Sequence, residues 1–481
     1  MKKIFIAFIC MAAGLLSCTN DDNILEEQTP AGVPMSFNIS VDETATMRAA
    51  KTSWANGDKI YVFFNGLATK YLVLTYDGSA WTNTSGGGTL LSTDFDGLDT
   101  KTITAVHFPT AVDVTYADSK FSFTSGGNPV YNYYLYETGK AYTVDGTTVN
   151  ATLSMGKPDN MVQIHVAGIQ ANVSDYTFGC SKMRPVACAS VGTDGAITES
   201  ALQAGARVSG VADADGGIFA GRLVYPGTAK DYKFTLASNS KIYTLTRDSK
   251  TLTAGKMYNF PSLTTTGGSN WAVQNASDLY VDLGLSVKWA KYNVGATTET
   301  ESGDYFAWGE VSGYNEGKTN FAWSTYFWGT SNTALTKYCN DANKGKDGYT
   351  DALTTLQPED DAAYAAMGGK FRMPTAAEIQ ELIDTKSNTT DYTWTKYPSD
   401  AEFECWKIVK NSTNATLYLR AGGYRYDTYL GSPGILGRYW SSSLDSEHTD
   451  EALDGHFDTS DVNKNNNRRQ LGFSVRAVYA E

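Results

Sequence analysis

Apolar and polar residues alternate in short stretches throughout the first half of the chain. The clearest example begins near the N-terminus, and its apolar positions are Met35, Phe37, Ile39 and Val41. A period of two residues is typical of a β-strand with one buried face. Similar stretches, separated by turn sequences, recur to about residue 263 without helical periodicity. The pattern predicts a mainly β fold with two β-sandwiches, over residues 33–150 and 151–263.

The pattern changes after a linker predicted at residues 264–277, which begins with a run of Thr, Gly and Ser. The following module, residues 278–481, holds seven of the ten tryptophans and the only two predicted helices. The first helix begins at Pro358, has acidic residues in its first turn and ends before two glycines. The second begins at Thr375. This mixture predicts an α+β module.

The start of the second helix is the one stretch that resembles an enzyme motif, GGKFRMPTAAE. Thr375 and Glu378 have the spacing of a capping box, in which the two side chains bind the free backbone N–H groups of a helix start. The pattern therefore favours a structural role for these residues over a catalytic one.

The N-terminus has the features of an exported lipoprotein. Two lysines and a short apolar run precede Leu15-Leu16-Ser17-Cys18, which resembles a bacterial lipobox. The resemblance implies removal of a signal peptide (residues 1–17), acylation of Cys18 with palmitate and anchoring to the outer membrane, with residues 18–32 as a tether. Asp21 and Asp22 resemble the export signals of surface lipoproteins in Bacteroidetes, although a solvated linker would have the same composition.

Composition and charge exclude several classes of function. The formal net charge is −13, which argues against binding nucleic acid or an anionic membrane surface. No Cys-x-x-Cys motif and no Cys/His cluster is present, so we expect no metal, no cofactor and no catalytic residue. The mature chain keeps four cysteines that could form disulfides: Cys180, Cys188, Cys339 and Cys405. They permit three pairings, and the sequence does not choose among these pairings.

The first half resembles a known family. The early alternating strand, Arg48-Ala49, the motif KTSWANGDKIYVF and the motif LTAGKMYNF are similar to the fimbrillin-like pilus subunits of Bacteroidetes, over about residues 33–263. The resemblance implies two transthyretin-like β-sandwiches and protease cleavage between Arg48 and Ala49. The leader and the first strand would then be lost, and a strand from a neighbouring subunit would take their place.

Strand exchange of this kind is physically reasonable for this sequence. Loss of the strand at residues 35–41 would expose apolar side chains and unpaired backbone groups, and a donated strand would cover both. The alternative for Arg48 is a single exposed basic residue in a flexible loop.

The second half resembles another family, the major paralogous domain of Fibrobacter and Bacteroidetes surface proteins. The matching segments occur in order over residues 278–479 and read YVDLGLSVKWA, GDYFAWGE, GKFRMPT, YWSSS and GFSVRAV. The resemblance implies a C-type-lectin-like fold with no agreed chemistry.

Enzymatic and calcium-dependent functions are less well supported by this half. Formylglycine-generating enzymes share the implied fold and have a stretch similar to residues 372–378, but their chemistry requires a redox-active cysteine pair. Cys339 and Cys405 are the only candidates, and their contexts favour a structural disulfide, with buried thiols as the alternative. The loop acids Asp454, Asp458 and Asp461 lack the spacing of a calcium loop, and a helix N-terminus explains Asp360 and Asp361. We therefore predict that the chain is not an enzyme.

One aromatic loop has the composition of a binding surface. Its candidate residues combine rigid rings with an arginine and an acid: Tyr424, Arg425, Tyr426, Asp427 and Tyr429. The alternative is that several of these rings belong to the core.

These observations predict a fimbrial subunit at the tip of a pilus on the cell surface. A chain that ends in a large globular module would accept a strand from the next subunit without giving one, and its last module would bind a host or bacterial glycan or protein. The second hypothesis is a lipoprotein that stays anchored at Cys18 and binds glycans without polymerising. The third is a formylglycine-generating-enzyme-like oxidoreductase.

Overall fold

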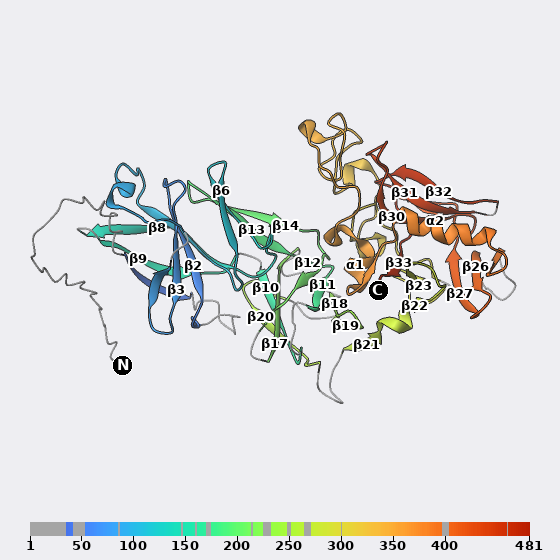
Figure 1. The fold of residues 1–481 in the computed structure, drawn as a ribbon, viewed down its shortest axis with the longest axis horizontal. Coiled ribbons are helices and arrows are strands. Elements are labelled where there is room, and N and C mark those ends of the chain that lie inside the picture. Colours follow the sequence, from blue (N-terminus) through green and yellow to red (C-terminus); the bar gives the residue numbers. More distant parts are fainter. Residues whose placement is uncertain are drawn as a thin grey trace, which may run out of the picture.

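The computed structural model describes most of the chain and confirms a mainly β fold. The described residues are 35–41, 53–84, 87–145, 148–158, 161–169, 175–212, 215–224, 232–247, 252–263, 271–299, 301–396, 404–458 and 460–481. The molecule is elongated, with the β-sandwiches at one end and the C-terminal module at the other (Figure 1). Among the described residues, no helix has the length and apolar character needed to cross a membrane.

Several predictions lie outside the described residues and remain predictions. These are the signal peptide, the lipidation of Cys18, the tether, the cleavage between Arg48 and Ala49, and residues 264–270 of the predicted linker.

The first β-sandwich is built from one strongly bent sheet of seven strands. In spatial order they are β1 (Met35–Val41), β9 (Thr148–Met155), β8 (Leu135–Asp145), β5 (Thr102–His107), β2 (Lys59–Phe64), β3 (Leu72–Tyr76) and β4 (Trp81–Thr84). The first part of β8 pairs with β5, and its last four residues pair with β9. The sheet therefore folds over one apolar core at β8.

The central strands of this sheet are buried on both faces, which explains their continuous apolar sequences. Ile60 and Val62 face the core under β9, whereas Tyr61 and Phe63 pack on the far side against Phe121. The sheet on that far side consists of β6 (Asp113–Ala117), β7 (Lys120–Thr124), β13 (Val186–Gly192) and β14 (Ile197–Ala201). This sheet joins strands that come before and after residue 150, the predicted boundary between the two sandwiches. Residue 150 itself lies within β9, so the two sandwiches share a sheet.

The second sandwich has two sheets around a core that includes Phe178, Phe219 and Phe234. One sheet contains β12 (Met183–Arg184), β17 (Gly216–Leu223), β10 (Met161–Ala167) and β20 (Met257–Phe260), with β16 (Val211–Ala212) beside β17. The other contains β15 (Val208–Ser209), β11 (Thr177–Cys180), β18 (Tyr232–Ala237), β19 (Lys241–Arg247) and β21 (Ala272–Asn275). β21 comes from the segment that was predicted to be a linker, and it extends this sheet instead.

The C-terminal module combines four small sheets with two helices. The first sheet contains β22 (Tyr280–Val281), β23 (Lys288–Asn293), β33 (Arg476–Tyr479) and β24 (Phe371–Arg372). The other three are β25 (Tyr392–Lys396), β26 (Cys405–Lys410) and β27 (Ala415–Arg420); β28 (Tyr424–Tyr426) and β29 (Tyr429–Gly431); and β30 (Gly437–Leu444), β31 (Glu451–Phe457) and β32 (Val462–Arg468). The helices are α1 (Ala362–Met367) and α2 (Ala376–Asp384).

The predicted capping box at the start of α2 is confirmed. The Glu378 N–H donates to the Thr375 hydroxyl at 3.2 Å, and the Thr375 N–H donates to the Glu378 carboxylate at 2.7 Å. Arg372 forms an ion pair of 2.6 Å with the same carboxylate. The motif that resembled an enzyme signature therefore serves to begin a helix.

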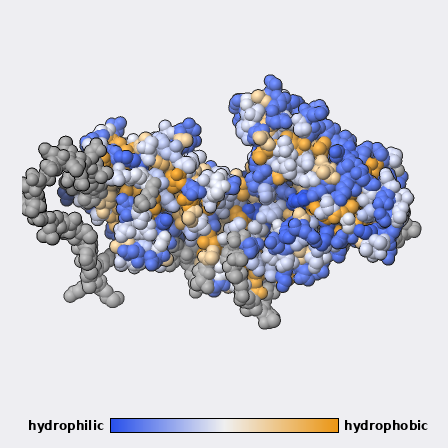
Figure 2. Space-filling view, in the orientation of Figure 1, coloured by the Kyte–Doolittle hydropathy of each residue, from blue (hydrophilic) through white to orange (hydrophobic). Residues whose placement is uncertain are grey.

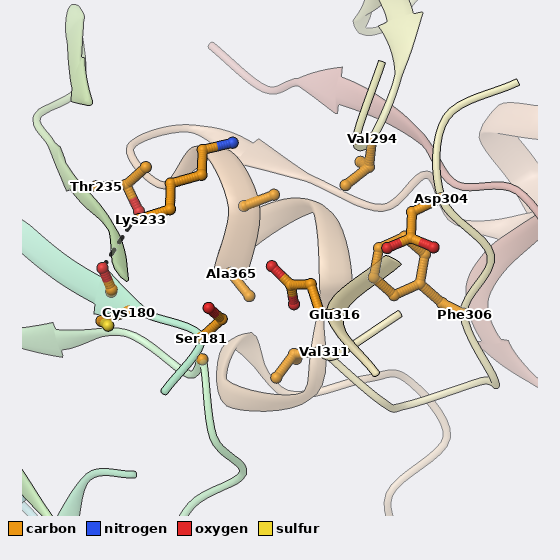
Figure 3. Close-up of a pocket in the computed structure, with 14 residues that line it drawn as sticks. Cys180, Ser181, Lys233, Thr235, Val294, Asp304, Phe306, Val311, Glu316 and Ala365 are labelled. Carbon is orange, nitrogen blue, oxygen red and sulfur yellow. Dashed lines mark hydrogen bonds between the residues drawn. The ribbon is translucent and has the colours of Figure 1, made fainter. Parts of the chain in front are cut away.

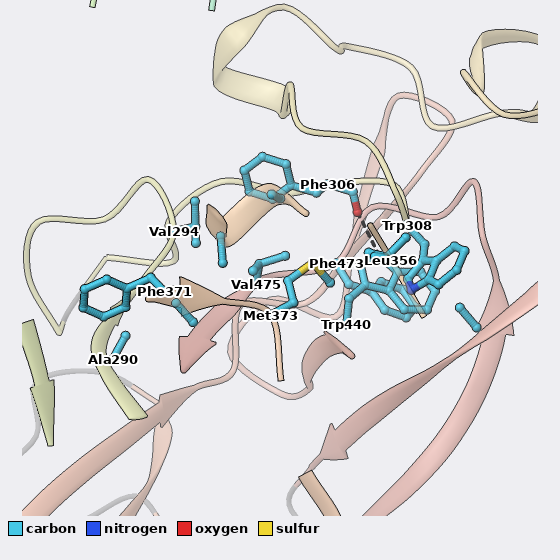
Figure 4. Packing of buried hydrophobic residues seen from close by; sticks show 14 of the residues in the cluster. Ala290, Val294, Phe306, Trp308, Leu356, Phe371, Met373, Trp440, Phe473 and Val475 are labelled. Atoms are coloured by element: carbon cyan, nitrogen blue, oxygen red, sulfur yellow. Dashed lines mark hydrogen bonds between the residues drawn. The ribbon is translucent and has the colours of Figure 1, made fainter. Parts of the chain in front are cut away.

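Tryptophans hold the main core of the module together (Figure 4). Trp440 stacks on Phe473 with 4.2 Å between ring centroids. The indole N–H groups are satisfied within the core, since Trp440 donates to the Phe306 carbonyl at 2.9 Å and Trp308 to the Ser441 carbonyl at 2.8 Å. Burial of such large rings without an orphaned donor gives a stable, specific core.

The structural disulfide favoured for Cys339 and Cys405 is wrong. Cys339 is a free, buried thiol whose Sγ donates to the Asp341 carbonyl at 3.2 Å. Cys180 and Cys188 are free and buried as well. Because each of these thiols sits among packed apolar residues or backbone, they act as small core residues.

Candidate strand-exchange edge and ligand-binding surface

The first strand lies at the edge of the seven-stranded sheet and can be removed without interrupting it. β1 runs parallel to β9, and its seven residues pair in unbroken register from Met35 opposite Val149 to Val41 opposite Met155. No other described strand pairs with β1. An edge strand that is held by one neighbour is the position at which β-strand addition takes place.

The two faces of β1 differ as its sequence predicts. Met35, Phe37 and Ile39 are half-buried and pack against the core of the first sandwich, while the polar residues between them are exposed. The Val41 side chain is not among the described ones. The strand thus contributes an apolar row to the core and presents a polar row to solvent.

The surface under β1 is strongly apolar. Val149, Leu153 and Met155 of β9 are fully buried in the structure, at 0 % exposure. Removal of β1 would uncover part of this core and one row of β9 backbone groups. Such a surface is a template for another strand.

The predicted ligand-binding residues lie on the β28–β29 hairpin, but the structure divides them. Tyr426 and Tyr429 are 50 % and 66 % exposed, so their rings are available to a partner. Tyr424 is half-buried and packs edge-on against Phe473. Asp427 occupies the turn with φ 50°, and its backbone exchanges hydrogen bonds with Phe321.

Arg425 holds the hairpin to the module. Its guanidinium lies 3.3 Å from the centroid of the Tyr314 ring and 5.0 Å from that of Tyr305. Its backbone N–H and carbonyl both pair with Gly472. Cation–π contacts at partly buried sites stabilise a fold, so Arg425 has a structural role and the exposed surface reduces to the two tyrosines.

The loop acids that were considered for calcium do not converge. Asp454 is buried and pairs with Arg438 at 3.0 Å and with the Asn467 amide at 2.8 Å. Asp458 and Asp461 close a turn, in which Asp458 accepts from the Asp461 N–H at 2.6 Å. Each acid therefore has a local structural function.

A buried polar cluster joins the second sandwich to the C-terminal module, and the sequence analysis missed it. Asp360 is 1 % exposed and accepts hydrogen bonds from Lys337 at 2.6 Å, from the Tyr338 hydroxyl at 2.6 Å and from Gln203 at 3.0 Å. Burial raises the pKa of Asp360, and these three donors oppose that rise. The sequence suggested only a helix N-terminus here, because Lys337 and Gln203 are distant along the chain.

Arg207 makes a second connection between the same two parts. Its guanidinium binds Thr177 and Thr235 of the sandwich and also donates to the Ala365 carbonyl of α1 at 3.0 Å. A cation at a helix C-terminus is favourable for the helix dipole. Gly368, which follows α1, lies so close that a Cβ atom there would be 2.7 Å from the Arg207 Nε.

Two adjoining cavities lie at this junction, of about 80 Å³ and about 190 Å³. Lys233, Asp304 and Glu316 surround the smaller one, with Cys180 at its wall (Figure 3). Burial raises the pKa of Cys180 to about 12, so this thiol stays protonated near neutral pH. A protonated thiol is a poor nucleophile, so Cys180 is unsuited to covalent catalysis at this cavity.

Comparisons with known proteins add distant structural likenesses. No protein-family model matches the chain, and no curated protein does. A proposed cell adhesion protein from Bacteroides fragilis NCTC 9343 matches with 12 % identity and a TM-score of 0.28, over 51 % of this chain and 97 % of that one. A fimbrial protein from Bacteroides ovatus ATCC 8483 matches with 12 % identity and a TM-score of 0.24, over 94 % of this chain and 100 % of that one.

The fimbrial anchor protein Mfa2 from Porphyromonas gingivalis matches with 13 % identity and a TM-score of 0.20, over 44 % of this chain and 78 % of that one. At such TM-scores and identities, we base neither the fold nor the function of this chain on these matches.

Proposed function

We propose that this chain is a structural and adhesive subunit of a bacterial surface filament, made as an outer-membrane lipoprotein precursor and assembled by strand exchange. The position of β1 carries the proposal. It is an edge strand with one apolar face on the core and a single partner, β9. After cleavage between Arg48 and Ala49, a strand from the next subunit would take the place of β1.

The energy of the exchange is modest enough to permit it. Each half-buried side chain of β1 contributes roughly 1 kcal/mol of apolar burial, which is about half the value for full burial. Each backbone hydrogen bond to β9 adds a net stabilisation of similar size. A donor strand with larger or better-buried apolar residues would therefore displace β1 once the connection at residues 42–48 is cut.

The arrangement of the C-terminal module supports a place at the end of the filament. β33 lies inside its sheet, between β23 and β24, and is therefore paired on both sides. A strand in that position is not available for donation to a neighbour. We infer that this subunit accepts a strand at one end and presents its C-terminal module, of C-type-lectin-like fold, at the other.

Adhesion is assigned to the exposed rings of the β28–β29 hairpin. Tyr426 and Tyr429 offer flat amphipathic surfaces of the kind that bind glycans and proteins. The face of the C-terminal module that Figure 2 shows is mostly hydrophilic. A partner that stacks on the two tyrosines would gain apolar contact from both rings.

Exchange can be tested on the folded protein. A specific protease site is introduced at residues 42–48, the folded chain is cut, and a labelled peptide with the sequence of residues 35–41 is added. We expect the peptide to replace β1 and remain bound through gel filtration. A Phe37→Asp peptide should fail, whereas an Asn38→Asp peptide, changed on the exposed face, should bind.

Either of two results would refute the proposal: no exchange after complete cleavage, or equal binding of both altered peptides. The first would favour the second candidate, a lipoprotein anchored at Cys18 that binds glycans without polymerising. The observation in favour of that candidate is that β1 already occupies its own groove.

A further inference from the structure

The turn between β30 and β31 brings together three side chains that are typical metal ligands. One ligand atom from each of Asp445, His448 and Glu451 lies within 4.8 Å of the other two. We propose that these three residues bind a divalent metal ion of the zinc type. This site is independent of strand exchange and of the two exposed tyrosines.

The backbone of the turn fixes where the ligands stand. Asp445 follows the last residue of β30, and Glu451 is the first residue of β31. The Asp445 N–H donates to the Glu451 carbonyl at 3.2 Å, and the Glu451 N–H donates to the His448 carbonyl at 2.7 Å. The three positions are therefore tied to one another and to a paired strand, which limits the entropy lost when a metal binds.

Outer contacts orient the Asp445 carboxylate. It accepts the Glu447 N–H at 2.9 Å and the Asn466 side-chain amide of β32 at 2.6 Å. The His448 Nδ1 lies 3.4 Å from the same carboxylate, and the His448 ring is 60 % exposed. Metal ligands are commonly held in this way by a second layer of hydrogen bonds.

Glu451 supplies the third candidate ligand of the site. Its carboxylate receives no hydrogen bond and no close ion pair from any residue that the structure describes. Asp445 and Asp450 are near it, and Arg468 faces it across the β31–β32 ladder. Asp450 has a cation of its own, Lys344 at 2.9 Å. A metal ion between Asp445 and Glu451 would neutralise the two carboxylates that otherwise repel each other.

A second His–carboxylate pair in the module shows the contrast. His456 lies 3.0 Å from Asp458, but the Asp458 carboxylate also accepts hydrogen bonds from the Ser460 N–H and hydroxyl and from the Asp461 N–H. Asp445 is engaged by as many donors as Asp458, so the difference lies in the third ligand: among the described residues, none lies beside the His456–Asp458 pair. That pair therefore provides a matched control.

The ligand set selects the type of metal. One imidazole nitrogen and two carboxylate oxygens suit zinc, which takes nitrogen and oxygen donors at about four positions. Calcium takes six to eight oxygen ligands and rarely an imidazole. Three protein ligands leave an open position on the exposed side of His448 for water or for a donor atom of a partner.

Metal binding would also tighten neighbouring segments. The Asn340 side chain donates to the Ser446 carbonyl at 3.1 Å, and Thr449 donates to the Tyr338 carbonyl at 3.0 Å. The turn is thus attached to the long loop that precedes α1. We expect bound metal to raise the thermal stability of the module.

The test uses the full mature chain without a histidine tag, stripped of metal and titrated with zinc chloride by calorimetry and native mass spectrometry. We expect one zinc ion per chain, binding weakened at least tenfold in both His448→Ala and Glu451→Gln, and no change in His456→Ala. Zinc should raise the melting temperature of the parent chain but not of the first two variants. Binding that survives in His448→Ala, no binding at all, or equal binding of calcium would overturn the proposal.

Discussion

The side-chain amide of Gln203 lies 3.0 Å from the carboxylate of Asp360, across the boundary between the second β-sandwich and the C-terminal module. The same Nε2 donates to the Gly309 carbonyl at 2.7 Å, and the Oε1 accepts the Val311 N–H at 3.2 Å. Gln203 is therefore a buried polar residue whose side chain bridges the second β-sandwich and the C-terminal module. Together with Arg207, it connects the C-terminal module to the second sandwich through buried hydrogen bonds.

Replacement of Gln203 by alanine should weaken this junction. It leaves the Val311 N–H and the Gly309 carbonyl without their partner, and each buried unsatisfied group costs about 1–3 kcal/mol. We expect Gln203→Ala to lower the urea midpoint followed by tryptophan fluorescence. Gln274→Ala, the same change at an exposed position of β21, serves as the control. Equal urea midpoints for the two variants would mean that the Gln203 hydrogen bonds do not stabilise the junction.

Gly368 should tolerate no side chain. Its φ is 66°, and a Cβ atom would lie 2.6 Å from the Ala237 Cβ. Gly368→Ala should therefore cost about 3 kcal/mol or more, from the backbone strain and the clash together. Gly348 also has a positive φ but no atom within 4 Å of a Cβ position, so Gly348→Ala should cost only about 1 kcal/mol. Chemical denaturation that ranks the two in the opposite order would contradict the packing of α1 against the sandwich.

The capping box should make stability depend on pH. Burial alone would raise the pKa of Glu378, but the hydrogen bonds from Arg372 and the Thr375 N–H prevail, and the pKa is lowered. A lowered carboxylate pKa stabilises the folded state above the unfolded value of 4.5, and this contribution is lost as the pH falls through the folded pKa.

Glu378→Gln keeps a capping side chain but loses the charge. Near neutral pH it should be less stable than the parent by about 1 kcal/mol, a small value because Arg372 is partly exposed. In acid, below the lowered pKa, the two proteins should unfold at the same denaturant concentration. Glu447→Gln, the same change at an exposed position, serves as the control. A stability difference for Glu378→Gln that persists unchanged in acid would refute the role of the charge.

Arg425 and Tyr429 should respond to alanine in different ways. Arg425→Ala removes the guanidinium that lies on Tyr314, and we expect a loss of about 1–2 kcal/mol in the free energy of unfolding. Tyr429→Ala should leave stability within about 0.5 kcal/mol of the parent, since the ring is largely exposed. In a cell or glycan adhesion assay only the tyrosine variant should lose binding while it stays fully folded. Loss of stability in both variants would place Tyr429 in the core.

Local patterns in the sequence predicted the features that depend on neighbouring residues. The alternation at Met35 to Val41 predicted a strand with one apolar face, and the Thr375–Glu378 spacing predicted a helix start, because both depend on the period of a single element. The mainly β character followed from many such stretches.

Features that depend on distant residues escaped prediction. The environment of Asp360 is made by Lys337, Tyr338 and Gln203, and that of Arg425 by two tyrosines more than a hundred residues earlier in the chain. Composition alone made Arg425 look like part of a binding surface. The spacing of Asp445, His448 and Glu451 also matches no standard metal motif, since a turn between two strands creates their proximity.

Strand removal is the central claim, and the N-terminus of the assembled protein tests it most directly. Filaments are isolated from the surface of the native cells, and the N-terminal peptide of this subunit is identified by mass spectrometry. The account predicts a chain that begins at Ala49, without residues 35–41, in species of high molecular mass. A chain that begins only at a lipidated Cys18 and retains β1 would contradict it.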